Sequence, residues 1–154
     1  MTTVLSVDEL AAVFVDAFAD VISTSTGVSL DILSSGNDTD FYELTGVINL
    51  NSNVQGMLFI SVSHATAQAL CASMTGVTKD EVSKDDYIDA LCEIANMTAG
   101  NAKLRLGNSG YLFSISSPFV IEGNQKSIFT KKKVHVISAS FDKDELSAKM
   151  KIVY

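Results

Sequence analysis

Residues 86–106 read DYIDALCEIANMTAGNAKLRL, and this stretch decides the fold that the sequence predicts. With side chains about 100° apart around a helix axis, its apolar residues fall on one side. That side is made of Ile88, Leu91, Ile94, Ala95, Thr98 and Ala102. A turn-rich stretch, residues 107–110, ends the pattern. The sequence therefore predicts a long helix from about Asp86 to Leu106, with its apolar side packed on a sheet.

The opposite side of this helix carries a polar stripe of Asp89, Glu93, Asn96 and Gly100. Steps of four, three and four residues keep the stripe within an arc of about 60°. As a solvent-facing surface it costs on the order of 2 kcal/mol, because two like charges stand one turn apart and Asn and Gly are weak helix formers. Two interpretations stay open: an arbitrary polar face, or a site whose acid and amide project outward into a partner.

The rest of the chain alternates helical and strand patterns. A capping box, Ser6 with Glu9, opens a helix that is predicted to reach about Thr24. Period-two alternation predicts strands, and the short connections among the first three favour antiparallel pairing. A second helix is expected at 64–74, and the strands are expected at 28–32, 42–50, 55–62, 111–116, 118–121, 128–129, 133–141 and 146–153.

These elements predict the fold class α+β, with antiparallel strands. A chain of 154 residues can bury a sizeable core, so we expect one domain, 1–154. A helix followed by strands occurs twice along the chain. This order predicts an internal pseudo-duplication.

Charge and composition argue against several classes of function. The formal net charge is −7 and no Lys or Arg precedes Lys79, which argues against nucleic-acid binding. The missing basic N-terminal region and the short apolar runs favour a cytoplasmic protein without membrane insertion. Without HExxH, CxxC or a Gly-rich phosphate loop, no metal or cofactor of its own is expected. Cys71 and Cys92 are predicted to be reduced core residues, and His64 and His135 structural ones.

The polar stripe also carries a family resemblance. Three, two and twenty-one residues separate Asp89, Glu93, Asn96 and Pro118, a spacing that resembles the signature of the CheC/CheX/FliY family of chemotaxis phosphatases. Residues 93–103, EIANMTAGNAK, resemble the CheX branch closely, and PFVIEG at 118–123 is similar to the proline-led strand of CheX-like proteins. The resemblance implies a CheC-like antiparallel sheet with long helices on one side, and dephosphorylation of CheY, an aspartyl-phosphate protein.

The resemblance favours the CheX branch over the CheC branch. CheC-type members carry two acid–amide sites, one in each half. In the first helix of this chain Glu9 is followed by Ala12, and Asp16 by Ala19, with no amide at either place. One site, on the helix at 86–106, is what the sequence predicts.

The resemblance also implies roles for these residues. Asn96 would place a water in line with the phosphorus, as Gln does in small GTPases, and Glu93 would pair with a lysine of the regulator. Asp89, Gly100 and Pro118 would form the partner-binding surface, with Mg²⁺ held by the regulator. For Asp89 a first-turn acid favoured by the helix dipole is the alternative, and for Pro118 a strand edge.

The expected partners are a phosphorylated CheY-like response regulator and a second copy of the chain. The resemblance implies a homodimer, and the long hairpin at 133–153 would leave an unpaired strand that a partner strand could cover. Lys131, Lys132 and Lys133 either attract an acidic partner or protect a strand edge. The alternative function is a non-catalytic module that binds a response regulator or a flagellar switch component through the same helix face.

Overall fold

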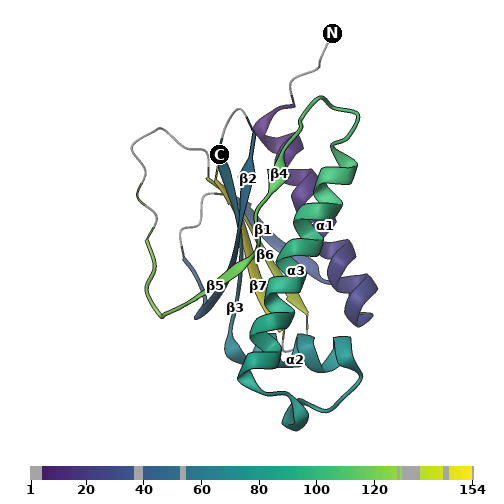
Figure 1. Ribbon diagram of the computed structural model, residues 1–154, viewed down its shortest axis with the longest axis vertical. Helices are drawn as coiled ribbons and strands as arrows, with labels where there is room; N and C mark the ends of the chain where they lie inside the picture. The colour runs from purple at the N-terminus through teal and green to yellow at the C-terminus, as the bar shows by residue number, and fades with distance from the viewer. Residues whose placement is uncertain are drawn as a thin grey trace.

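The computed structural model describes residues 5–36, 40–52, 55–127, 129, 136–143 and 146–153 (Figure 1). Three helices and a short 3₁₀ turn accompany the strands. In chain order the elements are α1 (Val7–Thr26), β1 (Asp31–Gly36), β2 (Leu44–Asn51), β3 (Gly56–Val62), α2 (His64–Thr75), η1 (Lys79–Glu81), α3 (Lys84–Arg105), β4 (Ser114–Ile115), β5 (Phe119–Glu122), β6 (Val136–Lys143) and β7 (Leu146–Val153).

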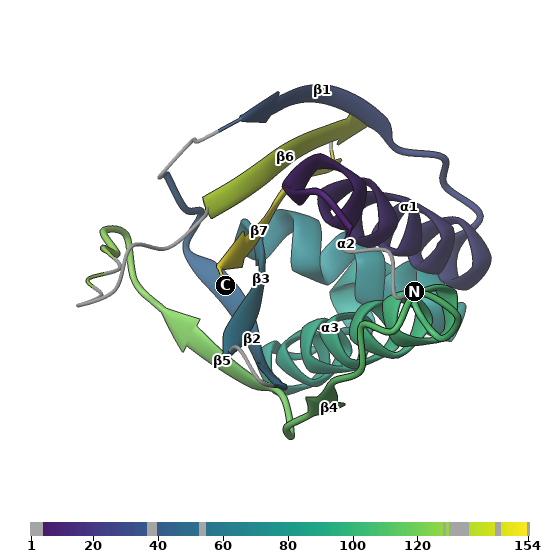
Figure 2. The same ribbon diagram turned by 90° about the horizontal axis from the view of Figure 1, so that it is seen from above.

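The strands of the described chain form one antiparallel sheet in the order β1-β6-β7-β3-β2-β4, and β5 also pairs with β2. Figure 2 shows the sheet curving from β1 to β5, with all three α-helices inside the curve. The expected α+β class with helices on one face is confirmed. The strand order is symmetric. If β1, β2 and β3 exchange places with β5, β6 and β7, the sheet has the same strand order when it is followed from the opposite edge. A duplicated unit would give this arrangement, and the pseudo-duplication itself stays a prediction.

The first strand differs from the prediction in both bounds and partner. β1 begins at Asp31 rather than at residue 28, because Val28 and Leu30 pack against the core beyond the left-handed cap at Gly27. It pairs with β6 and not with β2. Eight residue steps from Gly36 to Leu44 reach roughly 26 Å, more than the roughly 19 Å of four strand spacings. A short link can therefore carry the chain across the sheet.

The C-terminal hairpin lies inside the sheet. β6 pairs with β1 and β7, and β7 pairs with β6 and β3. The expectation of an unpaired terminal strand is wrong, because β1 covers the edge that the hairpin would otherwise expose. This removes the strand-edge argument for a dimer. Of the other predicted features, residue 129 carries no strand, and Ile128, Lys131, Lys132, Lys133 and His135 lie outside the described residues.

The main core lies between the sheet and the helices. Phe14, Phe18 and Ile22 of α1 are buried against Leu91 and Ile94 of α3 and the inner face of the sheet. α3 starts earlier than predicted, at Lys84, because Ser83 caps it in a reciprocal pair with Asp86. Its buried side is shifted: Ala90 and Ala99 are buried where Ile88 was expected, since α2 and α1 pack on its flanks. A smaller cluster, Val47, Phe59 and Val153, lies on the outer face of the sheet.

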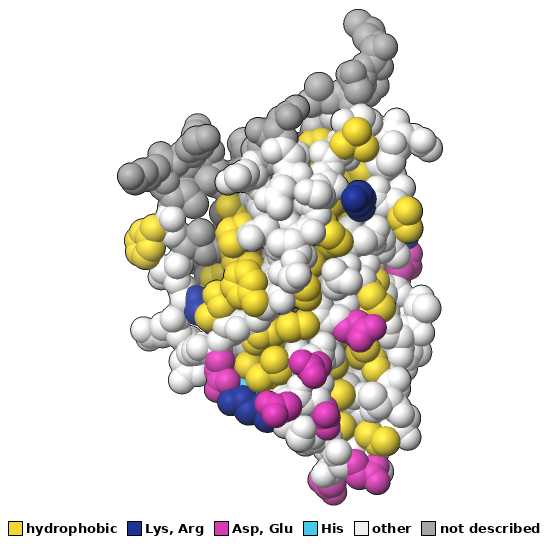
Figure 3. Space-filling model, viewed as in Figure 1, with side chains coloured by type: hydrophobic (Ala, Val, Ile, Leu, Met, Phe, Trp, Pro, Cys, Tyr) yellow, Lys and Arg dark blue, Asp and Glu magenta, His cyan; other side chains and the backbone are white. Residues whose placement is uncertain are grey.

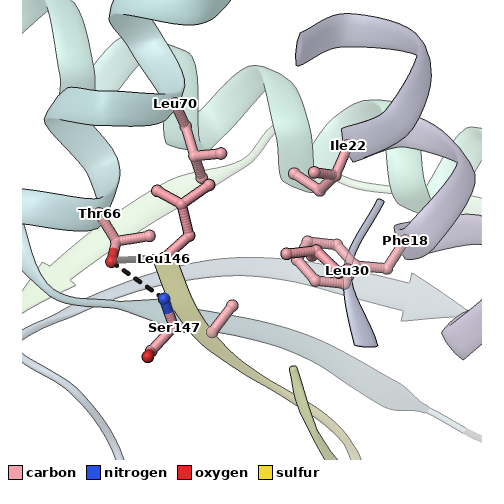
Figure 4. A pocket seen from close by; sticks show the side chains of 8 residues that line it. Phe18, Ile22, Leu30, Thr66, Leu70, Leu146 and Ser147 are labelled. Carbon is pink, nitrogen blue, oxygen red and sulfur yellow. Dashed lines mark hydrogen bonds between the residues drawn. The ribbon is translucent and has the colours of Figure 1, made fainter. Parts of the chain in front are cut away.

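Thr66 links α2 to β7 at a small cavity of about 10 Å³, too small for a ligand (Figure 4). Its Oγ1 accepts a hydrogen bond from the Ser147 backbone N–H at 3.3 Å. We expect Thr66→Val to lower the free energy of unfolding by about 1–3 kcal/mol, because the N–H loses this acceptor in a partly buried place.

Thr98→Val is the matched control for this change. Thr98 is also buried, but its Oγ1 donates to the Ile94 carbonyl of its own helix turn, and the variant deprives no N–H of an acceptor. Urea unfolding of both variants measures the two costs. An equal loss in both would contradict the role given to the Thr66–Ser147 contact.

Candidate functional site

Helix α3 presents the acid and the amide to solvent. Asp89, Glu93 and Asn96 are exposed, as the stripe predicts, and Gly100 is half-exposed. A Cβ placed on Gly100 would meet no atom within 4 Å, so this turn of the helix is open to close approach. Figure 3 shows acidic side chains gathered over the N-terminal part of α3. The stripe is therefore a rigid, helix-borne surface.

Gly46 sets the position of α3 on the sheet. A Cβ at Gly46 would lie 3.3 Å from Leu91 Cγ and 3.5 Å from Ala95 Cβ. The bare backbone of β2 lets the helix lie close to the sheet, with Leu91 and Ala95 fully packed between them. This contact therefore sets how close α3, and with it Glu93 and Asn96, lies to the sheet.

Beside α3, β4 and β5 follow each other along the edge of β2. Residues 116–118 between them form a bulge. Val47 pairs with Phe119 and Leu50 with Ile115, so three steps along β2 face four steps along the edge. Ser116 keeps the edge attached: its N–H donates to the Asn49 carbonyl at 3.1 Å, and its Oγ accepts from the Asn49 N–H at 2.9 Å. A bulge re-aims side chains locally, and a proline without an N–H is tolerated there.

The bulge and α3 together form a groove of about 610 Å³. Its walls are Asp89, Cys92, Glu93 and Asn96 from the helix and Ile115, Ser116, Ser117 and Pro118 from the edge. The structure thus brings Asp89, Glu93, Asn96 and Pro118 together, while Gly100 lies one turn beyond. Sequence reasoning missed Ser116 and Ser117. Their position directly before Pro118 was the available signal.

Asp89 and Glu93 also border a second hollow, of about 400 Å³, on the α2 side of the helix. Cys71 lies in this hollow, and Cys92 lies in the groove. Burial raises the pKa of both thiols, and the carboxylate of Asp89 raises each further. Both cysteines are free, as predicted, but Cys92 is half-exposed rather than a core residue. Thiols with raised pKa values stay protonated at neutral pH and are weak nucleophiles.

An ion pair ties the end of β5 to the start of α3. Lys84 Nζ lies 2.8 Å and 3.1 Å from the two carboxylate oxygens of Glu122. His64, at the start of α2, lies 3.8 Å from Glu122 through Nε2 and shares a 3.0 Å hydrogen bond with Tyr87 through Nδ1. This environment fits the structural role expected for His64. The cluster holds three elements around one end of the groove.

The Glu122–Lys84 pair predicts a pH dependence of stability. The hydrogen bond from Lys84 holds the pKa of Glu122 below its ordinary value of 4.5, and the same bond holds the pKa of Lys84 above 10.5. The stabilisation from Glu122 is therefore present above about pH 4.5 and is lost as pH falls through its lowered folded-state pKa. That from Lys84 is present below about pH 10.5 and is lost as pH rises through its raised folded-state pKa.

The predicted loss of stability at low pH is checked by measuring the Tm of wild type and of Glu122→Gln between pH 3 and 8. We expect the difference in Tm to be constant near neutral pH and to shrink in acid. A difference that does not change with pH would contradict the assignment.

In the described residues, no group of three or more His, Cys, Asp or Glu side chains could hold a metal ion. A search of the same residues finds no helix long and apolar enough to cross a membrane. The helix wall of the groove offers a carboxylate, Glu93, and an amide, Asn96, on an exposed surface.

A curved antiparallel sheet here carries one long helix that exposes an acid and an amide beside the proline at the sheet edge. The chain matches the family model described as "Chemotaxis phosphatase CheX" over residues 44–142, and it belongs to this family.

Known proteins resemble the chain in sequence and in fold. "CheY-P phosphatase CheX" of Thermotoga maritima is 29% identical over 87 residues, so the match spans 56% of each protein. The crystal structure of chemotaxis protein CheX from Desulfovibrio desulfuricans superposes with a TM-score of 0.81 at 25% identity, covering 94% of this chain and 97% of that one. CheX in the CheX–CheY–BeF₃–Mg²⁺ complex from Borrelia burgdorferi gives 0.77 at 20% identity, over 92% and 94%. At that identity the Borrelia protein is evidence for the fold alone.

Proposed function

We propose that this chain is a phosphatase that hydrolyses the aspartyl phosphate of a CheY-like response regulator in the cytoplasm, and so ends a chemotaxis signal. The observation that carries the proposal is the exposure of Glu93 and Asn96, one helical turn apart, on the wall of the groove that Pro118 completes. Membership of the chemotaxis phosphatase family supports it. The relative in Thermotoga is named for the same activity.

Asn96 is the proposed catalytic amide. Its carbonyl oxygen accepts a hydrogen bond from a water, and its NH₂ donates to a phosphoryl oxygen, which aligns the water with the phosphorus. The water oxygen bonds to phosphorus as the bond to the aspartyl oxygen breaks, giving inorganic phosphate and a free carboxylate. The Mg²⁺ that neutralises the phosphoryl charge would be held by the regulator. The complex from Borrelia burgdorferi contains CheX, CheY, BeF₃ and Mg²⁺ together.

Glu93 is the proposed docking residue, pairing with a lysine of the regulator. Asp89 adds a second carboxylate one turn back, Gly100 leaves room for close approach, and Pro118 shapes the opposite wall. We expect Glu93→Ala to weaken regulator binding by roughly 10- to 150-fold, the range for a desolvated charge-assisted contact.

Asp80→Ala is the matched control, because it removes the same charge from the exposed turn η1 outside the groove. Isothermal titration with the beryllofluoride-loaded regulator measures both variants. Equal affinity for wild type and Glu93→Ala would remove Glu93 from the docking surface.

The function is tested by the decay of a phosphorylated CheY-like regulator, with and without this chain at one hundredth of its concentration. Faster decay with many turnovers per chain is the expected result. Unchanged decay together with measurable binding would overturn the phosphatase and favour the non-catalytic binding module. Neither decay nor binding would overturn both.

We also propose a homodimer, which rests on family resemblance now that the C-terminal hairpin is paired on both sides. Sedimentation velocity at micromolar concentration tests it. A single species near the chain mass of 16.5 kDa would remove the dimer and leave the assignments of Glu93 and Asn96 in place.

A further inference from the structure

Lys103 is the exception among the basic side chains that the structure describes, because no hydrogen bond, ion pair or ring contact engages it. The others are engaged: Lys84 with Glu122, Arg105 with Asp20 and Asn101, Lys126 with three backbone carbonyls, Lys149 and Lys151 over aromatic rings, and Lys79 with a neighbouring group. Lys103 is exposed near the C-terminal end of α3. A free cation in this acidic chain can take a partner from outside.

Lys103 also continues the polar stripe. It follows Gly100 by three residues and Asn96 by seven, which places it within about 20° of Asn96 around the helix and about 10 Å along it. Asp89 and Glu93 lie on the other side of Asn96 along the same stripe. Figure 3 shows the acidic end of this stripe, with acidic side chains gathered over the N-terminal part of α3.

We propose that Lys103 is a specificity-determining residue that binds a carboxylate on the regulator, an inference that rests on the proposed phosphatase function. The stripe presents negative charge before Asn96 and positive charge after it. A partner must carry the complementary order: a cation against Glu93, the phosphoryl group against Asn96, and an anion about 10 Å further along the helix. Two contacts of opposite sign fix the direction in which the regulator lies on α3.

Gly100 lies between the two contact points and supports this geometry. A side chain there would stand between Asn96 and Lys103, whereas the bare helix backbone leaves open space. The partner can thus reach both residues at once. A role for Lys103 in helix stability alone would not require it to lie on this stripe, because Arg105 already places a positive charge in the last turn.

The test is the affinity of the chain for a CheY-like regulator of the same genome, loaded with Mg²⁺ and BeF₃⁻. We expect Lys103→Gln to weaken binding roughly two- to fivefold and Lys103→Glu by about tenfold or more, since the latter sets like charges against each other. Lys103→Arg should bind like wild type. The loss should shrink as salt is raised from low to high ionic strength.

Arg105→Gln is the matched control. It removes one positive charge from the same helical turn, but Arg105 lies on the opposite side of the helix and pairs with Asp20 of α1. Its affinity should stay within about a factor of two of wild type. A double-mutant cycle with neutralised regulator carboxylates should find one position whose loss is not additive with Lys103→Gln.

The outcomes separate the two proposals. Wild-type binding with no loss in Lys103→Glu, or with an equal loss in Arg105→Gln, overturns the role of Lys103 and leaves the phosphatase standing. No binding by the wild type together with unchanged decay of the phosphorylated regulator overturns the phosphatase, and this inference with it.

Discussion

Asn96→Ala is expected to reduce the rate of regulator dephosphorylation by roughly 10²- to 10⁴-fold, the contribution expected from a group that positions a reactant. The fold should be unaffected, because Asn96 is exposed and Ala is the better helix former. Binding of the regulator should be nearly unchanged, since Glu93 and its neighbours remain. The loss therefore belongs in kcat. Single-turnover decay of the phosphorylated regulator at saturating chain measures it.

Asn101→Ala is the control for this prediction. Asn101 lies five residues further on, away from the stripe, and its side chain accepts a hydrogen bond from Arg105 at 2.6 Å. Dephosphorylation by this variant should match wild type. If Asn96→Ala keeps full activity, or if both variants lose it equally, the water-placing role given to Asn96 is wrong.

Leu91→Ala is expected to lower the free energy of unfolding by about 2–5 kcal/mol, because a buried leucine leaves a cavity that its neighbours fill only in part. Leu91 is 1% exposed and lies between α3 and the backbone of Gly46. Leu104→Ala is the matched control on the same helix. Leu104 is 85% exposed, and its loss should change stability by less than about 0.5 kcal/mol.

Gly46→Ala adds a sharper test of the same contact. In wild type the new Cβ would lie 3.3 Å from Leu91 Cγ, so crowding offsets the gain from replacing a strand glycine. In the Leu91→Ala background that crowding disappears and the methyl group fills part of the cavity. Gly46→Ala should therefore stabilise the double variant more than the wild type, by about 0.5 kcal/mol or more in a urea-unfolding cycle. Strict additivity would show that α3 does not rest on Gly46.

Local periodicity predicted those parts of the site that a single element carries. The exposure of Asp89, Glu93 and Asn96 follows from their spacing on one helix, and α3 has it as expected. The groove opposite them depends on the pairing of the edge strand with β2, which leaves one extra residue near Pro118. Pairing between distant segments leaves no local pattern, so Ser116 and Ser117 were missed.

The errors in the sheet have the same origin. The alternation at 28–32 reflects the packing of Val28 and Leu30 against the core. It does not tell which strand is the neighbour, and β1 pairs with β6 from the far end of the chain. For the same reason the sequence predicts the hairpin at a sheet edge, whereas β1 pairs with β6 there. Strand order is a property of the whole chain, and neither propensity nor loop length determines it.

The position of β7 in the sheet has a consequence for folding during synthesis on the ribosome. β7 follows every other described element in the chain, yet it lies between β6 and β3, where Val153 pairs with Met57. Until β7 is synthesised, the edge of β3 that pairs with it has no partner strand. The apolar residues that β7 covers in the folded protein stay exposed. The sheet can close only when the residues of β7 leave the exit tunnel. Because this pairing joins segments about ninety residues apart in the chain, we expect the sheet to close after the helices have formed.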